Sequence, residues 1–575
     1  MRDDSSGSER SEEEARVSLR ALLGKVKPST CTWQRKVNQI LHNKMLDVLT
    51  SHQSCLAKEK FETCISHKYD CLSPLSILLC DGATKDTLEA IYKLYPHTLS
   101  EPSERGKLPL HYACEFGTED TVIEFIIDNF PPASFVRDRE GYLPIHIAME
   151  QSITRQASFR TLAALVKVFP GSVWEPMHCS TPLDCAFNFR YSQNVLNLFL
   201  EQIPSSLAAF QLSKDCFLSL EAAQSISNYL LPRLTQFTCL ARSQSIEAFQ
   251  HIMDCLQQNE SIAKLSFVLP RYVFSEGGAA FSKMLQENKA ILDITFLGAE
   301  PRLVTTAGFE HDRCIHPIME GLQSSIMQRD SLTLTDFALS DSALLSDLLC
   351  SPNIPTTVSL SNVRISGESL NSSISWSKSF VEDLNLHLCH MEYSFVADIL
   401  SRLNLLPNLR ALSFGATFLH EGILDVTEPI CALLFQNRLF SLTIDNDHNT
   451  LILDMKSVCG ALEHNHTLKY LDVYWALESK EGMSYLVSLL DNHNVTLNTV
   501  PITTESFRSP MGQKIQYYTK LNRYGREVAR ESDTNLSDLI FLLSEAVTAT
   551  SAPFADGNIL FGLLRETPAL WSGGS

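Results

Sequence analysis

The chain has 575 residues, of which 44% are hydrophobic and 20% charged, and its formal net charge is −19 at pH 7. The length exceeds what one compact core usually holds, and the composition is that of a folded globular protein, so we expect several domains or a stack of repeats. The acidic balance disfavours nucleic acid as a general partner, because it repels phosphate groups.

The N-terminus and the cysteines indicate a location. Residues 1–16 are polar and acidic, without the apolar core of a secretory signal, and no apolar run approaches the ~20 residues that cross a bilayer. The 16 cysteines include no Cys-x-x-Cys pair. We therefore expect a cytoplasmic protein, or alternatively a nuclear one, with reduced thiols, no membrane partner and a disordered acidic tail over residues 1–30.

Proline marks the first internal period. Four similar strings, PLSILL, PLHYAC, PIHIAM and PLDCAF, follow one another at intervals of 35, 35 and 38 residues. They begin at Pro74, Pro109, Pro144 and Pro182. A second proline follows each opening proline after 22 to 26 residues. Because proline is favoured at the first position of a helix and just beyond its end, each interval predicts a short helix, a turn and a longer helix.

These strings resemble the ankyrin repeat, whose signature begins T-P-L-H-x-A. Residues 108–113 and 143–148 match the signature closely, but Leu108 and Leu143 replace the capping threonine, so those caps must be made otherwise. The resemblance covers about 70–205 and implies an all-α ankyrin-repeat solenoid, which we assign to residues 31–212. It also implies that His111 and His146 make hydrogen bonds between repeats rather than catalyse a reaction.

A second rhythm, L-x-x-L-x-L, begins near residue 230 and predicts short strands. Its first apolar positions are Leu234, Ile262, Ile291, Leu334, Pro355, Val381, Leu409, Leu439, Leu468 and Leu497. Intervals of 43 and 21 residues interrupt an otherwise regular spacing of 26 to 30, so the boundaries between 298 and 380 stay open. Amphipathic helices are expected between the strands. Several end at an asparagine, which we interpret as a left-handed helix cap: Asn259, Asn288, Asn465 and Asn494.

This strand-and-helix pattern resembles the leucine-rich repeat of the ribonuclease-inhibitor type over about 230–505. The resemblance implies a horseshoe with a curved parallel sheet and helices outside, assigned to residues 213–505. Residues 506–575 are predicted to form a C-terminal helical cap. Its expected apolar contacts are Leu539, Phe541, Leu542, Leu560, Leu563, Leu564 and Trp571. The predicted fold class is thus an α/β repeat protein.

Two clusters invite a chemical interpretation. His311, Asp312, Cys314 and His316 are zinc-type ligands, but they form one cluster in an apparent loop, so we predict no metal site. A basic aromatic segment in the tail is expected to be the solvated face of a capping helix rather than an RNA site. Its members are Lys514, Tyr517, Tyr518, Lys520, Arg523, Tyr524, Arg526 and Arg530. No phosphate loop, nucleophile elbow or kinase signature is present, so no catalytic residue or cofactor is predicted.

Strand geometry predicts the binding residues. Alternate side chains of a strand face opposite sides, so the residues between the ladder leucines line the concave sheet. The candidates there are Asn385, His387, Ser413, Thr443, Asp445, Tyr470 and Asp472, with Tyr474 at the rim and Glu382 and Asp383 flanking them. Tyrosine and carboxylates together suit a basic protein partner, and a merely solvated sheet is the alternative. The analogous loop tips of the ankyrin-like part are Glu104, Arg105, Arg137, Asp138 and Arg139.

These predictions combine into an intracellular scaffold or adaptor that binds protein partners, is not an enzyme and has no evident small-molecule substrate. Two alternatives stay open. The chain is the recognition subunit of a regulatory assembly, such as a ubiquitin-ligase receptor or a sensor, or it is an RNA binder or cryptic enzyme that uses the C-terminal tail.

Overall fold

The structure is a computed structural model. It describes residues 74–80, 82–94, 96–150, 156–177, 180–269, 277–298, 312–325, 327–339, 342–351, 353–365, 376–391, 393–418, 423–446, 449–523, 526, 562–563 and 565. The chain divides into two compact units. The N-terminal unit comprises residues 1–234 and 240–252, and the C-terminal unit comprises residues 235–239 and 253–575. The fold combines helices with a large parallel sheet, which confirms the predicted α/β class at that level.

The N-terminal unit begins with paired helices. The first helices of the pairs are α3 (Pro74–Cys80), α5 (Pro109–Phe116), α7 (Pro144–Met149) and α9 (Pro182–Asn188). The second helices are α4 (Lys85–Leu94), α6 (Asp120–Asn129), α8 (Phe159–Val168) and α10 (Gln193–Glu201). Short 3-10 helices follow the first three pairs: η2 (Pro96–Ser100), η3 (Pro131–Phe135) and η5 (Pro170–Trp174). Each opening proline therefore starts a helix, as predicted.

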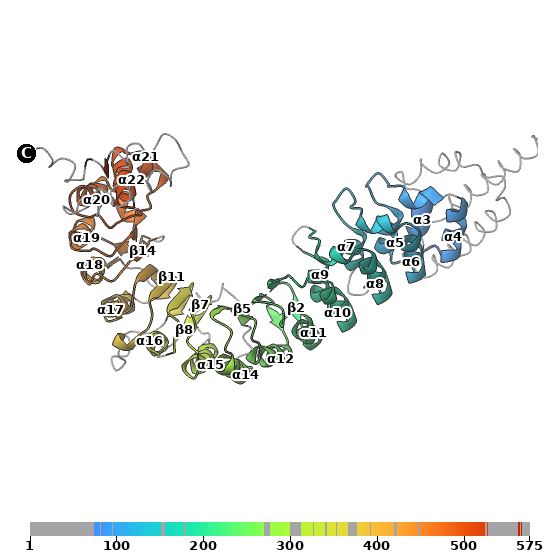
Figure 1. The fold of residues 1–575 in the computed structure, drawn as a ribbon, viewed down its shortest axis with the longest axis horizontal. Coiled ribbons are helices and arrows are strands. Elements are labelled where there is room, and N and C mark those ends of the chain that lie inside the picture. The colour runs from blue at the N-terminus through green and yellow to red at the C-terminus, as the bar shows by residue number, and fades with distance from the viewer. Residues whose placement is uncertain are drawn as a thin grey trace, which may run out of the picture. The chain divides into compact units, whose positions relative to one another are not determined.

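The helix pairs pack in two layers. First helices contact first helices of the neighbouring pair, and second helices contact second helices (Figure 1). Val122, Ile126 and Leu162 are fully buried between them. Each such aliphatic side chain contributes about 1.5–3 kcal/mol when it leaves water, so the stack is held mainly by this apolar interior.

Two buried histidines bond the N-cap residues of α5 and α7, where leucine stands in place of the capping threonine. His111 Nδ1 accepts a hydrogen bond from the backbone N–H of Leu108 at 3.1 Å, and His111 Nε2 lies 3.2 Å from the carbonyl oxygen of Tyr142 in the next pair. His146 repeats the arrangement with Glu175 O at 2.7 Å. Since Nδ1 accepts, the proton sits on Nε2 and the ring is neutral. The predicted bonds between neighbouring pairs are therefore confirmed.

Short strands and helices complete the N-terminal unit after α10. They are β1 (Ala209–Leu212), β2 (Phe217–Leu218), α11 (Leu220–Tyr229) and β4 (Ser243–Gln244), while α12 (Ile246–Gln257) has residues in both units. β2 and β4 pair in parallel.

One parallel sheet organises the C-terminal unit. Its strands follow chain order: β3 (Gln236–Cys239), β5 (Lys264–Leu269), β6 (Asp293–Gly298), β7 (Ser331–Thr335), β9 (Thr357–Ser361), β11 (Asp383–Met391), β12 (Ala411–Phe418), β14 (Ser441–Asp445) and β16 (Tyr470–Asp472). Short parallel ladders join β8 (Ala338–Leu339) to β10 (Arg364–Ile365) and β10 to β11, and β13 (Leu424–Asp425) to β15 (Leu451–Ile452).

Helices cover one face of this sheet (Figure 1). They are α14 (Gly278–Glu287), α15 (Asp312–Gln323), α16 (Ser342–Cys350), α17 (Tyr393–Leu403), α18 (Thr427–Phe435), α19 (Met455–Leu462) and α20 (Lys480–Asn492), with the 3-10 helices η7 (Trp376–Lys378) and η8 (Tyr474–Leu477). Ladder side chains such as Leu386, Leu442 and Leu471 point into the interior and are fully buried. The opposite face carries no helix among the described residues.

Two predicted strand motifs differ from the structure. At the last one, Leu497 to Ile502, the chain forms only an isolated bridge between Thr499 and Tyr470. The pattern places the fourth motif at Leu334, Phe337 and Leu339, but β7 pairs Leu332 with Ile294, so the ladder begins five residues earlier. Leu339 belongs instead to β8 and the second, shorter ladder.

Arg329 explains the difference at the fourth motif, because it stands where the motif has its first leucine. It is 1% exposed, and its guanidinium donates to the carbonyl oxygens of Ile291 and, at 2.7 Å, of Leu285. Burial lowers the pKa of Arg329 to about 10, so the group stays charged at neutral pH. A search for apolar residues at regular spacing does not detect a strand whose first motif position is an arginine.

The backbone of the helix-end asparagines also differs from the prediction. Asn288 has φ −70° and ψ 130°, which is extended rather than left-handed. Asn259, Asn465 and Asn494 also have negative φ angles, so none of them is left-handed. A left-handed asparagine does end α18, at Asn437 with φ 52°.

The asparagine side chains instead link successive modules, by which we mean one strand of the sheet with the helix that follows it. Asn494 Nδ2 donates to the carbonyl of Leu462, the last residue of α19, at 3.1 Å. Asn494 Oδ1 accepts from the N–H of Leu497 at 2.9 Å. Asn465 does the same one module earlier, donating to Leu434 O at 2.6 Å. These buried amides satisfy helix-end carbonyls and strand-start N–H groups that no water reaches.

The tail begins as two helices, α21 (Thr504–Arg508) and α22 (Pro510–Arg523), and α22 packs against α20. Leu563 is 1% exposed, and Gly562 lies beside Tyr517 and Leu521. The other predicted cap contacts, Leu539, Phe541, Leu542, Leu560, Leu564 and Trp571, lie outside the described residues.

Asn494→Ala removes the amide that bonds both the carbonyl of Leu462 and the N–H of Leu497. We expect the free energy of unfolding to fall by several kcal/mol, at ~1–3 kcal/mol for each buried backbone group left unpaired. The matched control is Asn492→Ala, whose exposed amide only donates to Ser488 O within its own helix, with an expected change of about 0.5 kcal/mol or less. Urea midpoints of the two variants decide the matter, and equal midpoints contradict the linking role.

His111 and His146 make the stability of the helix pairs depend on pH. Burial lowers the pKa of both, so the folded state prefers the neutral ring. Their contribution is fully present above the unfolded value of 6.5 and is lost as the pH falls toward the depressed folded pKa. We expect unfolding of the wild type to become easier between pH 7.5 and 5.5. In the double variant His111→Asn with His146→Asn this pH dependence shrinks although stability is lower throughout, and an unchanged pH dependence contradicts the assignment.

Candidate protein-binding surfaces

The open face, the side of the β3–β16 sheet opposite its helices, carries most of the predicted binding residues. Along β11, Leu384 and Leu386 are buried, whereas Asp383 is exposed and Asn385 and His387 are half-buried. The same alternation in β12, β14 and β16 brings further predicted residues to this face: Ser413, Thr443, Asp445, Tyr470 and Asp472. Strand pairing thus assembles the predicted set on one surface.

One line of polar side chains crosses the open face at the third residue of each strand, and we call it the polar row. In order from β3 to β16 its members are Thr238, Ser266, Thr295, Thr333, Ser359, Asn385, Ser413, Thr443 and Asp472. All are half-buried, and only Asp472 is charged. Such short side chains let another protein approach the sheet closely.

The centre of the open face presents hydroxyl groups alone. The exposed positions of β7 and β9 pair as Ser331 with Thr357, Thr333 with Ser359, and Thr335 with Ser361. A neutral hydrogen bond contributes about 0.5–1.5 kcal/mol net, and serine and threonine are under-represented among interface hot spots. This centre therefore provides contact area rather than most of an affinity.

Negative charge collects toward β16. Earlier on the face, Lys264 Nζ lies 3.3 Å from Asp293 Oδ2, so that carboxylate is balanced. The carboxylate of Asp383 accepts only a long hydrogen bond from Thr357, at 3.5 Å. Among the described residues, no lysine or arginine side chain lies within 4 Å of Asp383 or Asp472. The β11–β16 end of the face is therefore acidic.

His387 and Asp445 meet over β12. His387 Nδ1 lies 3.7 Å from Asp445 Oδ2, beyond hydrogen-bond distance, so the contact is electrostatic and is strongest when the ring is protonated. The strand between them has Gly415, at which a Cβ would lie 3.1 Å from Asp445 Cβ and 3.7 Å from His387 Nδ1. The missing side chain allows residues of β11 and β14 to approach each other across the strand.

Tyr470 and Asp472 form the last pair on the face. The Tyr470 hydroxyl donates to Asp472 Oδ2 at 3.3 Å. Burial, followed by the charge of Asp472, raises the pKa of Tyr470, so the phenol stays protonated at neutral pH. Asp472 Oδ1 is buried and accepts no hydrogen bond from the described residues. Tyr474, in η8, is half-buried at the end of the strand.

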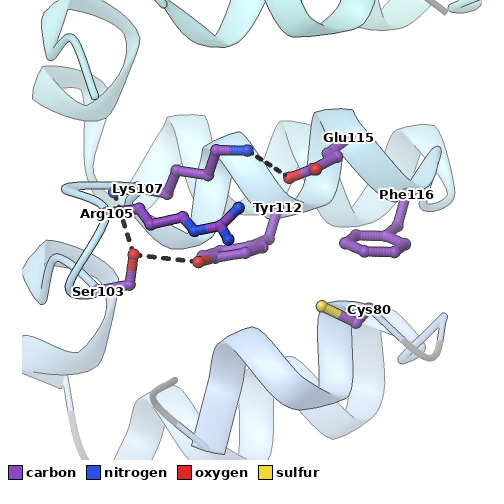
Figure 2. A pocket seen from close by; sticks show the side chains of 7 residues that line it. All are labelled: Cys80, Ser103, Arg105, Lys107, Tyr112, Glu115 and Phe116. Atoms are coloured by element: carbon purple, nitrogen blue, oxygen red, sulfur yellow. Dashed lines mark hydrogen bonds and ion pairs between the residues drawn. The ribbon is translucent and has the colours of Figure 1, made fainter. Parts of the chain in front are cut away.

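The N-terminal unit has a hollow of about 200 Å³ beside α3 and α5, lined in part by Cys80 and Phe116 (Figure 2). Lys107 Nζ forms an ion pair with Glu115 at 2.9 Å, and the Tyr112 hydroxyl donates to Ser103 Oγ at 3.0 Å. The volume is below the ~300 Å³ at which small-molecule sites begin, and suits one side chain of a partner.

Arg105 lines this hollow and a neighbouring one of about 420 Å³ that Glu140, Tyr142 and Glu150 help to form. Its exposed guanidinium makes no hydrogen bond or ion pair with the described residues, as Figure 2 illustrates for the side chains drawn. Of the predicted loop-tip cations, Arg105 is thus available to an anionic group.

Asp138 is not an exposed loop-tip contact, contrary to the prediction. It is 6% exposed, and its Oδ1 accepts from the backbone N–H groups of Glu140 at 3.0 Å and Tyr142 at 2.8 Å. Aspartate accepts such bonds in turns, so it shapes this loop rather than offering a contact. Arg137 is exposed but pairs with Glu175 at 2.5 Å, and Arg139 is exposed with its backbone N–H bonded to Arg105 O.

In the described part of the basic aromatic tail segment, Lys514, Lys520 and Arg523 are exposed, as predicted for a solvated helix face, whereas Tyr518 and Arg526 are buried. Arg526 is buried, donates to Asp491 O at 3.0 Å and stacks 4.9 Å from the Tyr518 ring centre. Arg523 donates to Thr499 Oγ1 at 3.0 Å. Two further members, Tyr524 and Arg530, lie outside the described residues.

The zinc-type cluster falls at the start of α15 rather than in a loop. His311 and the side chains of Asp312, Cys314 and His316 lie outside the described part of the structure. Among the side chains that are described, no three or more His, Cys, Asp or Glu residues are placed to hold a metal ion. None of the described helices has the length and apolar character needed to cross a membrane.

Comparison of the sequence with protein-family models gives no match, and neither does comparison with curated proteins. The function is therefore inferred from the surfaces described above.

Asp138→Ala tests the corrected role of this residue. Two backbone N–H groups lose their acceptor, so we expect unfolding of the N-terminal unit to become easier by about 1–3 kcal/mol. Arg137→Ala breaks an exposed ion pair and should cost about 1 kcal/mol or less. Thermal unfolding of both variants measures the difference, and an Asp138 variant as stable as the Arg137 variant refutes the turn-forming role.

Proposed function

We propose that the chain is a non-enzymatic scaffold or adaptor that binds other proteins through two repeat arrays. The first is an ankyrin-type solenoid over residues 31–212, and the second is a leucine-rich-repeat solenoid of the ribonuclease-inhibitor type over residues 213–505, closed by a helical cap over residues 506–575. The paired helices with their T-P-L-H-x-A-like starts support the first part. The in-register leucine ladder beneath parallel strands supports the second.

The observation that carries the proposal is the acidic, tyrosine-bearing end of the open face. Asp383, Asp445, Tyr470 and Asp472 come from β11, β14 and β16, and strand pairing holds them at fixed spacing. A fixed array needs little ordering when a partner binds, which favours affinity. Carboxylates beside a rigid aromatic ring complement lysine and arginine, so the proposed partner is a basic protein.

The chemistry of the buried groups supports a binding role over catalysis. Burial raises the pKa of Cys114, Cys389 and Cys459 to about 12, so these thiols are not nucleophilic thiolates at neutral pH. His111 and His146 have both ring nitrogens engaged by the backbone. None of the cysteines that the structure describes forms a disulfide, which also supports the proposed cytoplasmic or nuclear location.

The alternative, a recognition subunit of a larger regulatory assembly, would bind its substrate through the same open face. It therefore differs from the scaffold proposal only in the proteins that the chain joins. The RNA-binding alternative is weaker, since Arg523 and Arg526 already bond within the chain.

The double variant Tyr470→Ala with Asp472→Ala tests the open face. We expect it to lose at least about tenfold in affinity for the basic protein captured by the wild-type chain, with the wild-type affinity falling as salt rises. The matched control is Thr333→Ala with Ser359→Ala, two members of the polar row in the hydroxyl centre, which should bind within about threefold of wild type. Calorimetric titration measures both. Equal affinities for wild type and the acidic-end variant remove the open face as the binding surface.

A further inference from the structure

A second surface of the C-terminal unit exposes apolar side chains that the open face does not use. Leu405, Phe435 and Phe440 are 54%, 55% and 42% exposed. They lie where helices α17 and α18 end and strands β12 and β14 begin, an edge that we call the strand-start rim. Leu405 precedes β12 by six residues and Phe435 precedes β14 by six, so the two occupy the same position in neighbouring modules. One exposed leucine needs no explanation, but a repeated position marks a patch.

The next module extends this patch. His464 precedes β16 by six residues, and its ring stacks on Phe435 with centroids 6.4 Å apart and planes at 27°. Lys469 Nζ lies 5.9 Å from the Phe440 ring centroid, and the backbone N–H of Lys469 donates to Phe440 O at 2.9 Å. These two contacts extend the patch to His464 and Lys469 of the next module.

The rim is positively charged although the chain carries −19. Arg438 and Lys469 are exposed on it, and Glu463, beside His464, contributes an opposing charge. Arg410, which precedes β12, is also exposed but is paired with Glu382 at 3.7 Å. Cations near helix C-termini are stabilised by the helix dipole, which accounts for the positive charge alone. The dipole gives no reason for Phe435 and Phe440 to stay exposed among those cations.

Side-chain amides fix the rim across modules. Gln436 Nε2 donates to Asn404 O at 3.1 Å, and Asn437 Nδ2 donates to His464 O at 3.0 Å. Asn437 Oδ1 accepts from the N–H of His466 at 2.7 Å. The left-handed backbone of Asn437 aims its amide at the next module. A partner therefore meets a rigid surface, which lowers the entropic cost of binding.

We propose that the strand-start rim binds an acidic segment of a partner protein that also carries apolar side chains. Leucine or phenylalanine of the segment packs against Leu405, Phe435 and Phe440, while its carboxylates pair with Arg438 and Lys469. The favoured chemistry is opposite to that of the open face, so the two surfaces select different partners. A nucleic acid fits less well, because His464 already stacks on Phe435 and Leu405 offers no ring to a base.

Fluorescence anisotropy on the full chain tests the rim with three labelled probes: a peptide in which Leu and Phe alternate with Glu and Asp, its twin with Lys in place of the acids, and an oligouridylate of equal length. We expect the acidic peptide to bind, with a Kd that rises with salt. The Kd should rise at least about tenfold in Phe435→Ser with Phe440→Ser, and likewise in Arg438→Glu with Lys469→Glu. The matched control is Ile423→Ser with Ile452→Ser, which are 61% and 50% exposed beside the β13–β15 ladder and should bind as wild type.

The substituted side chains are exposed, so circular dichroism should show each variant folded. Absence of acidic-peptide binding, equal binding by the rim variants and wild type, or binding of the oligouridylate in place of the peptide each overturns the proposal. Tyr470→Ala with Asp472→Ala should bind the acidic peptide normally, so failure of the rim and failure of the open face are distinguishable.

Discussion

The structure depends on the pairing of backbone groups at the helix ends, where one module covers the next and excludes water. Asn465 and Asn494 each donate to a carbonyl of the preceding module and accept from the backbone N–H three residues further along the chain. Arg329 takes over this duty with a guanidinium in place of an amide. His111 performs the equivalent step between helix pairs. An unpaired buried group costs about 1–3 kcal/mol, so no module is complete without its neighbour.

This dependence shapes the surfaces. Because modules join in sequence order, equivalent residues form rows across the surface. The side chains in each row decide whether that part of the surface is polar, charged or apolar. On the open face the row runs from hydroxyls at Thr333 and Ser359 to carboxylate at Asp472. At the strand-start rim the same regularity repeats an exposed apolar position at Leu405 and Phe435. The chain thereby presents two surfaces of opposite charge in the C-terminal unit.

Much of this organisation can be predicted from the sequence, because proline positions and ladder leucines obey local rules. The failures have physical causes. Arg329 hides a strand behind a residue that no apolar pattern includes, and Asp138 reads as an exposed loop tip although its loop folds around it. Helix-end asparagines were expected to act through backbone conformation, whereas Asn494 acts through its side chain. The rim escaped notice because its residues stand between predicted elements, although the equal spacing of Leu405 and Phe435 before their strands is visible in the sequence.

In the proposed complex, carboxylates of the open face touch a basic partner. Zero-length carbodiimide cross-linking of the complex, followed by mass spectrometry, tests this contact directly, because this reagent joins a carboxylate only to an amine in contact with it. The account predicts cross-links from Asp383, Asp445 or Asp472 to lysines of the partner. Cross-links confined to acidic residues on the helices, such as Glu428 or Glu481, would contradict it.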